Sequence, residues 1–137
     1  MALYKGNILL YTGFTKEKHH QHNSQEEFII AEKQTAGRDH LGKLAPKFAE
    51  LNDDVLFGEV WSREAELSPR DRSMITIAAL FSAGLYPQLK SHLALGEAHG
   101  ITREEAVEIV TQLAFYCGWP MAWSTFPLIA EVWPEEE

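Results

Sequence analysis

The 137-residue sequence has little cysteine, few positive charges and no long hydrophobic run. Its single cysteine, Cys117, excludes a disulfide framework, a cysteine-rich zinc site and a Cys-x-x-Cys redox centre within one chain. Lysine and arginine number 12 against 20 acidic residues, and the resulting net charge of -8 disfavours nucleic acid and membrane surfaces as partners. No apolar run reaches membrane-spanning length and no signal-peptide pattern is present, so we expect a cytoplasmic protein.

Motifs for common cofactors are also missing. The chain has no glycine-rich phosphate loop, Walker motif or dinucleotide fingerprint, and we expect no cofactor. His19, His20 and His22 lie close together, but no carboxylate stands at a fixed spacing from them. We therefore expect no metal site.

What is present is the composition of a globular protein, with 45% hydrophobic and 23% charged residues. Residues 1–23 mix apolar residues with glycine and end in a polar run, so we expect an N-terminal arm or extension. Residues 24–137 carry dense helix signals and no long alternating strand pattern. The sequence predicts an all-α domain of about six or seven helices over this range.

The first helix signals lie between residues 24 and 60. Ser24 followed by Glu27 predicts a capped helix start, and Gly37 is a suitable end. Apolar residues then recur at helical spacing, with an interruption predicted at Pro46. A further segment is expected to begin at Asn52.

Four later helices have clear boundaries. Ser68, followed by a proline and an acidic residue, predicts an N-cap, and Pro87 predicts the start of the next helix. Thr102 with Glu105 predicts a capping box. Gly118 is expected to separate the last two helices.

His92 is the first candidate for chemistry. It shares a predicted helix face with Leu89 and Leu93, and a histidine on an apolar face has a perturbed pKa suited to acid–base work. The alternative is a core histidine whose ring is satisfied by a backbone carbonyl.

Charged residues form a second group of candidates. Glu59 and Arg63 stand four residues apart, a spacing at which they pair along a helix; alternatively, Glu59 donates a proton and Arg63 holds a substrate carboxylate. Arg70 and Arg72 fall in the first turn of a predicted helix, where the helix dipole disfavours positive charge. This placement indicates either a partner, which is an anion or an acidic residue such as Glu59, or simple solvation. Cys117 is either a nucleophile or a small buried apolar residue.

Several segments together resemble the carboxymuconolactone decarboxylase family. They are Gly58-Glu59-Val60-Trp61-Ser62-Arg63, the run from Leu67 to Leu80, Leu89-Lys90-Ser91-His92, Gly100-Ile101-Thr102-Arg103-Glu104-Glu105 and Tyr116-Cys117-Gly118-Trp119-Pro120-Met121-Ala122. Their order and spacing agree over roughly residues 38 to 133. The resemblance implies an alkylhydroperoxidase-D-like helical fold that assembles as a homotrimer or homohexamer.

The resemblance also implies one of two chemistries. One branch of the family decarboxylates gamma-carboxymuconolactone in aromatic-acid breakdown without a cofactor. The other branch reduces peroxides through a Cys-x-x-Cys-x-x-x-His motif, whose cysteines fall here at Leu85 and Gln88 if His92 is the motif histidine. We therefore expect a carboxy-lyase acting on a small carboxylated lactone or a related acid. The alternatives are a thiol-dependent peroxidase and a non-catalytic oligomer that binds a ligand.

Under this resemblance, His92, Glu59 and Arg63 are the expected catalytic residues. The expected substrate-binding residues are Arg72, Trp61, Tyr116, Trp119, His99 and Trp123. Four positions depart from the decarboxylase pattern, because this chain has Ala98, His99, Trp123 and Pro127 where decarboxylases tend to carry Asn, Asn, Asn and His. These departures indicate a substrate of different shape.

Overall fold

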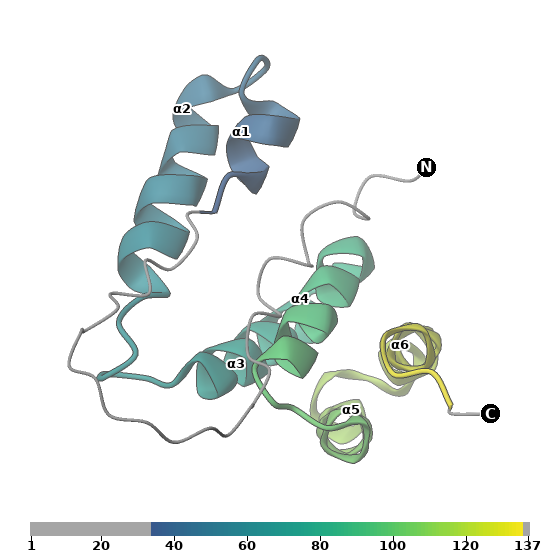
Figure 1. Cartoon of the computed structure of the whole chain (residues 1–137). Helices are drawn as coiled ribbons and strands as arrows, with labels where there is room; N and C mark the ends of the chain where they lie inside the picture. The colour runs from purple at the N-terminus through teal and green to yellow at the C-terminus, as the bar shows by residue number, and fades with distance from the viewer. Residues whose placement is uncertain (1–33, 136–137) are drawn as a thin grey trace, which may run out of the picture. The chain divides into compact units, whose positions relative to one another are not determined.

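The structure is a computed structural model, described here for residues 34–135. In that range the chain forms two compact units that divide between Ser62 and Arg63. All of the regular elements in the two units are helices, which confirms the predicted all-α class for residues 34–135 (Figure 1). None of these helices is long and apolar enough to cross a membrane. The arm expected over residues 1–23 and the helix start predicted at Ser24 lie outside the described residues.

The first unit contains α1 (Ala36–Leu41), α2 (Pro46–Glu50) and the π-helix η2 (Leu51–Val60). Gly37 was expected to end a helix, but it is the second residue of α1 and is buried. Pro46 begins α2 rather than interrupting it, because the fixed φ of proline suits the first helical position. The segment expected to begin at Asn52 corresponds to η2, which begins one residue earlier and continues directly from α2.

Glycine at position 37 is required by the close approach of α1 to the helix that follows. A Cβ atom there would lie 2.6 Å from Asp53 Oδ1 and 2.9 Å from the Ala49 carbonyl oxygen. Both distances are shorter than a van der Waals contact. The missing side chain therefore lets the Asp53 carboxylate reach the start of α1.

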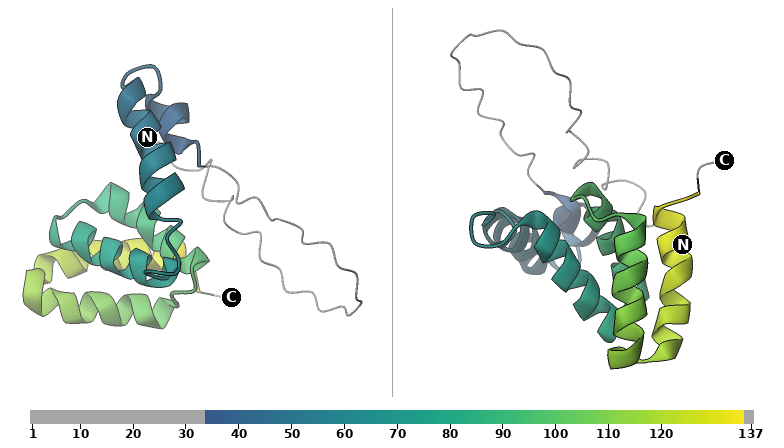
Figure 2. Two further views of the ribbon diagram at one scale, coloured as in Figure 1. Left: turned by 90° about the vertical axis from the view of Figure 1, so that its left-hand side faces the viewer. Right: turned by 90° about the horizontal axis from the view of Figure 1, so that it is seen from below.

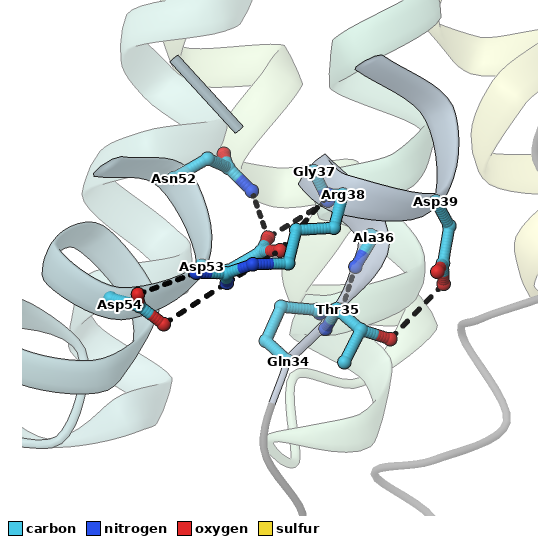
Figure 3. Close-up of polar contacts among 9 residues, drawn as sticks. All are labelled: Gln34, Thr35, Ala36, Gly37, Arg38, Asp39, Asn52, Asp53 and Asp54. Atoms are coloured by element: carbon cyan, nitrogen blue, oxygen red, sulfur yellow. Dashed lines mark hydrogen bonds and ion pairs between the residues drawn. The ribbon is translucent and has the colours of Figure 1, made fainter. Parts of the chain in front are cut away.

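Asp53 is the polar centre of the first unit (Figure 3). Its side chain is fully buried and accepts hydrogen bonds from the backbone N–H groups of Gly37 (2.8 Å) and Arg38 (3.0 Å) and from Asn52 Nδ2 (2.9 Å). The Arg38 guanidinium lies 3.3 Å from the same carboxylate and also pairs with Asp54. Burial would raise the pKa of the Asp53 carboxyl, but the hydrogen bonds outweigh it and the pKa is lowered. An ionised Asp53 thus caps α1 from a distant part of the sequence.

The second unit contains α3 (Pro69–Ser82), α4 (Tyr86–Ala98), α5 (Arg103–Cys117) and α6 (Trp119–Val132). Local capping explains their starts. Ser68 Oγ accepts the backbone N–H of Asp71, and Thr102 and Glu105 form the reciprocal capping box predicted from the sequence. Gly118, with φ of 128°, separates α5 from α6 as expected.

A single apolar core holds the four helices of the second unit together. Each helix contributes one buried stripe, and α3 packs on α4 while α5 packs on α6 (Figures 1 and 2). The buried core residues are Ile77, Phe81, Leu89, Leu93, Ile101, Ala106, Val110, Ala114, Ala122 and Ile129. This core fixes the positions of the candidate residues on α3, α4, α5 and α6.

Candidate functional site

His92 lies midway along α4, beside the buried residues Leu89 and Leu93. Its side chain is half-buried, and the Nδ1 atom is inaccessible to solvent. Burial lowers the pKa of the His92 imidazole below its ordinary value. The ring is therefore uncharged at neutral pH, a state in which one nitrogen donates and the other accepts a hydrogen bond.

A second histidine, His99, follows the C-terminal end of α4. Its Nδ1 atom lies 2.8 Å from the hydroxyl oxygen of Ser73, a fully buried residue of α3. Burial lowers the pKa of His99, while a hydrogen bond with the Pro69 backbone and the charge of Glu64 oppose the shift. The Ser73–His99 pair thus links α3 to the end of α4.

Ser73 is a polar residue that sequence reasoning missed. It stands four residues before Ile77, which in turn stands four residues before Phe81, and all three are buried on one face of α3. A serine in line with two large core residues was the available signal, because a buried hydroxyl needs a hydrogen-bond partner.

The two predicted arginines of the second unit differ in their surroundings. Arg72 donates from Nε to the Leu67 carbonyl (3.2 Å) and from Nη2 to the Arg63 carbonyl (2.9 Å), so it holds the segment before α3 in place. Arg63 is exposed, and its nearest described acid is Glu66 at 3.9 Å. Arg63 therefore has more freedom than Arg72 to meet a substrate carboxylate.

Arg70 has the partner that its unfavourable position in the helix indicated. Its guanidinium pairs with the Glu105 carboxylate, which also belongs to the capping box of α5. The hydrogen bond from the Thr102 backbone is the main cause that lowers the pKa of the Glu105 carboxyl, and the hydrogen bond from the Arg70 side chain lowers it further. Arg70 thus has an acidic partner, as one of the alternatives expected, but that acid is Glu105 rather than Glu59, and the pair joins the starts of α3 and α5.

Glu59 and Trp61 belong to the first unit. Glu59 is exposed near the end of η2, and Trp61 follows that helix and stacks on Phe57 with ring centroids 5.9 Å apart. Arg63 lies beyond the end of η2, so Glu59 and Arg63 do not share a helix as their spacing suggested. The catalytic role of Glu59 stays a prediction.

The predicted aromatic residues gather on α5 and α6, which run side by side in the second unit (Figure 2). Tyr116, Trp119 and Trp123 are all exposed, and Trp119 meets Phe115 edge to face at 5.6 Å. Beside them lies a groove of about 460 Å³. Its lining residues are Thr111, Ala114, Trp119, Ala122, Trp123, Phe126, Pro127 and Ala130.

This groove offers little to a charged ligand. None of its lining residues carries a charge, and the only lining hydroxyl, that of Thr111, donates to the Val107 carbonyl. A carboxylate in the groove would lose its hydration and meet no cationic side chain, and the indole N–H groups of Trp119 and Trp123 are the remaining side-chain donors of the lining residues. The predicted substrate-binding roles of Tyr116, Trp119 and Trp123 therefore stay predictions.

Among residues 34–135, no group of three or more His, Cys, Asp or Glu side chains is placed to hold a metal ion. The histidine cluster at residues 19–22 lies outside this range. Cys117 is a half-buried free thiol at the end of α5.

Comparison with known proteins agrees with the helical architecture. The sequence model of the carboxymuconolactone decarboxylase family matches residues 46–131. The chain belongs to this family. The match to the carboxymuconolactone decarboxylase family includes every predicted catalytic and substrate-binding residue, because these lie between Glu59 and Trp123.

Individual relatives support the same family. The chain is 28% identical over 106 residues to the 4-carboxymuconolactone decarboxylase of Acinetobacter baylyi, covering 72% of this chain and 78% of that protein. It is 28% identical over 99 residues to an uncharacterized 15.0 kDa protein of Paracoccus denitrificans, covering 71% and 73%. It is also 34% identical over 73 residues to peroxisomal protein 2 of Schizosaccharomyces pombe, covering 51% of this chain but only 34% of that protein.

Proposed function

We propose that this protein is a cofactor-independent carboxy-lyase acting on a small carboxylated lactone or a related acid of aromatic breakdown. The observation that carries the proposal is the half-buried, uncharged imidazole of His92 in a chain of the carboxymuconolactone decarboxylase family. The similarity to a relative named 4-carboxymuconolactone decarboxylase, along most of both chains, supports this substrate class.

The chemistry needs no bound cofactor. In gamma-carboxymuconolactone, the departing carboxylate is conjugated through a double bond to the ring carbonyl, and this carbonyl accepts the electron pair when carbon dioxide leaves. The protein must hold the carboxylates, stabilise negative charge on the lactone oxygen and protonate the resulting dienolate.

The described residues have properties that suit these tasks. His92 donates a hydrogen bond to the lactone oxygen or delivers the proton, because its neutral ring carries one N–H group. Arg63 holds a carboxylate, since its exposed guanidinium is available for a bidentate contact. Glu59 serves as the acid in this proposal. Arg72 supports the backbone of the segment that carries Arg63.

The proposal is tested by incubating the purified protein with gamma-carboxymuconolactone and following release of carbon dioxide. We expect a rate well above that of the heat-denatured chain at the same concentration. The monomethyl ester of the departing carboxylate is the matched control substrate, and it should release none. Release no faster than the uncatalysed rate would contradict the proposal.

Cys117→Ala should leave the rate of carbon dioxide release unchanged. The proposed reaction uses no thiol, and alanine retains a small apolar side chain at this half-buried position. The unchanged protein and Cys117→Ala are then both assayed for consumption of an alkyl hydroperoxide in the presence of a dithiol reductant. Peroxide consumption that disappears with Cys117 would favour the thiol-dependent peroxidase instead.

A further inference from the structure

Arg72 differs from the other arginines of the chain in its lack of an acidic partner. All five arginines lie within residues 34–135, and four of them pair with a carboxylate. Those pairs are Arg38 with Asp53 and Asp54, Arg63 with Glu66, Arg70 with Glu105, and Arg103 with Glu135. No acidic side chain of the described residues pairs with Arg72. This is unexpected in a chain with 20 acidic and 12 basic residues.

The guanidinium of Arg72 is held in place without being neutralised. Its side chain is half-buried in the first turn of α3, where Nε donates to the Leu67 carbonyl and Nη2 to the Arg63 carbonyl. Carbonyl oxygens orient the group, but they carry no net charge that would cancel its own. The dipole of α3 adds partial positive charge at the same end of the helix. Arg72 therefore presents a fixed positive charge that lacks a counter-charge.

One edge of the Arg72 guanidinium remains available to a ligand. The two hydrogen bonds to carbonyls use the edge that carries Nε and Nη2, and the opposite edge carries Nη1 and the second N–H of Nη2. Nη1 has no acceptor among residues 34–135 and is not a buried atom, so it reaches solvent. The parallel N–H groups of this edge match the two oxygens of a carboxylate. Because the side chain is already ordered, a carboxylate that binds there costs little rotamer freedom.

A second positive charge belongs to the same short segment. The Arg63 carbonyl accepts hydrogen bonds from Arg72 Nη2 and from the backbone N–H groups of Glu66 and Leu67, so the turn before α3 is tied to Arg72. The Arg63 side chain itself is exposed, with Glu66 at 3.9 Å as its acidic neighbour. One arginine is thus fixed and the other is freer, and both lie in the second unit. Two such charges suit a ligand with two carboxylates.

We infer that Arg72 determines specificity for a dicarboxylate, because its available edge binds the carboxylate that the substrate keeps. The inference rests on the proposed function, which supplies the class of substrate. The departing carboxylate loses its negative charge as carbon dioxide forms, so a fixed arginine on it would stabilise the bound substrate more than the transition state. The retained carboxylate keeps its charge throughout the reaction. The fixed Arg72 therefore suits the retained group, and the freer Arg63 suits the departing one.

Binding of an unreactive lactone to the full chain tests the inference. The ring-saturated lactone keeps both carboxylates but lacks the double bond, so it cannot lose carbon dioxide by the proposed route. A second ligand is the same lactone with its retained carboxylate converted to an amide. Isothermal titration calorimetry should show that Arg72→Gln weakens binding of the dicarboxylate by about 10–100-fold and leaves binding of the monoamide unchanged. A merely structural role of Arg72 would weaken both ligands equally.

Two further variants complete the test. Arg72→Lys keeps the positive charge but loses the planar pair of donors, so its affinity for the dicarboxylate should lie between those of Arg72→Gln and the unchanged protein. Arg103→Gln is the matched control, because Arg103 is also a half-buried arginine at the start of a helix but pairs with Glu135. It should bind both ligands as the unchanged protein does. Circular dichroism checks that every variant is folded.

Three outcomes would overturn the inference. They are no binding of the dicarboxylate by the unchanged protein, unchanged binding of it by Arg72→Gln, and equal weakening of both ligands by that variant. The outcome is separate from that of the proposed function, since binding is measured without carbon dioxide release. Loss of dicarboxylate binding in Arg72→Gln, in a protein that releases no carbon dioxide, would contradict the proposed function alone. Carbon dioxide release with the same KM in Arg72→Gln and in the unchanged protein would contradict this inference alone.

Discussion

His92→Gln should lower kcat/KM for decarboxylation of gamma-carboxymuconolactone by about 10²–10⁴-fold, the range expected when a positioned proton donor is removed. Glutamine keeps a hydrogen-bonding side chain of similar reach but cannot transfer a proton near neutral pH. Initial rates of carbon dioxide release measure the effect. The half-buried position of His92 between Leu89 and Leu93 makes this conservative change preferable to one that leaves a cavity.

His40→Gln is the matched control, because His40 is an exposed histidine of α1 outside the predicted site. It should retain the full rate. NMR titration of His92 provides an independent check, since burial should place its pKa below the ordinary histidine value. An unaffected rate in His92→Gln would contradict the catalytic role of His92. A solvated His92 with an ordinary pKa, in a protein that releases no carbon dioxide above the uncatalysed rate, would argue for a ligand-binding oligomer without this catalytic step.

Asp53→Ala should destabilise the first unit by about 3 kcal/mol. The substitution leaves the backbone N–H groups of Gly37 and Arg38 without their acceptor, and that of Gly37 is buried. It also removes the acceptor of the Asn52 side chain. Amide hydrogen exchange over residues 36–50, measured in the full chain, should show faster exchange there, with the Gly37 and Arg38 amides affected first.

The contribution of Asp53 should depend on pH. Because its folded-state pKa is lowered, the stabilisation is fully present above about pH 4 and is lost as pH falls through the folded-state value. Asp53→Asn is the control, since it keeps the size and one acceptor oxygen but should remove this pH dependence. The exchange experiment can also contradict this role of Asp53. If the amide hydrogens of residues 36–50 exchanged equally fast in Asp53→Ala and in the unchanged protein, the Asp53 carboxylate would not be the group that holds α1 in place.

The helix starts could be predicted because their signals are local. Ser68 and Thr102 each bond a backbone N–H three residues ahead, and Gly118 ends α5 through its own backbone conformation. Pro46 was misread for the same local reason, because a proline within an apolar pattern suits both a helix break and a helix start. Only the packing of the following helix decides between the two.

The polar interior could not be predicted, since its partners are far apart in the sequence. Asp53 bonds residues 15 and 16 positions before it, and Ser73 meets His99 after 26 positions. Helical periodicity identifies the face on which Ser73 lies but not the residue that it meets. Gly37 was likewise read as a helix end, whereas its lack of a side chain serves the contact with Asp53.

The π-helical geometry of η2 changes the direction in which the Glu59 side chain points. Hydrogen bonds closing over five residues instead of four add about one residue to each turn, so each residue advances by about 80° rather than about 100°. Over the eight steps from Leu51 to Glu59, the difference accumulates to about 160°. Glu59 therefore faces nearly the opposite side from the one that an α-helical wheel assigns to it. The hydrogen-bond register of η2 therefore sets the direction in which the Glu59 carboxylate points. A change of register would rotate Glu59 to another face of the helix without any change in the sequence.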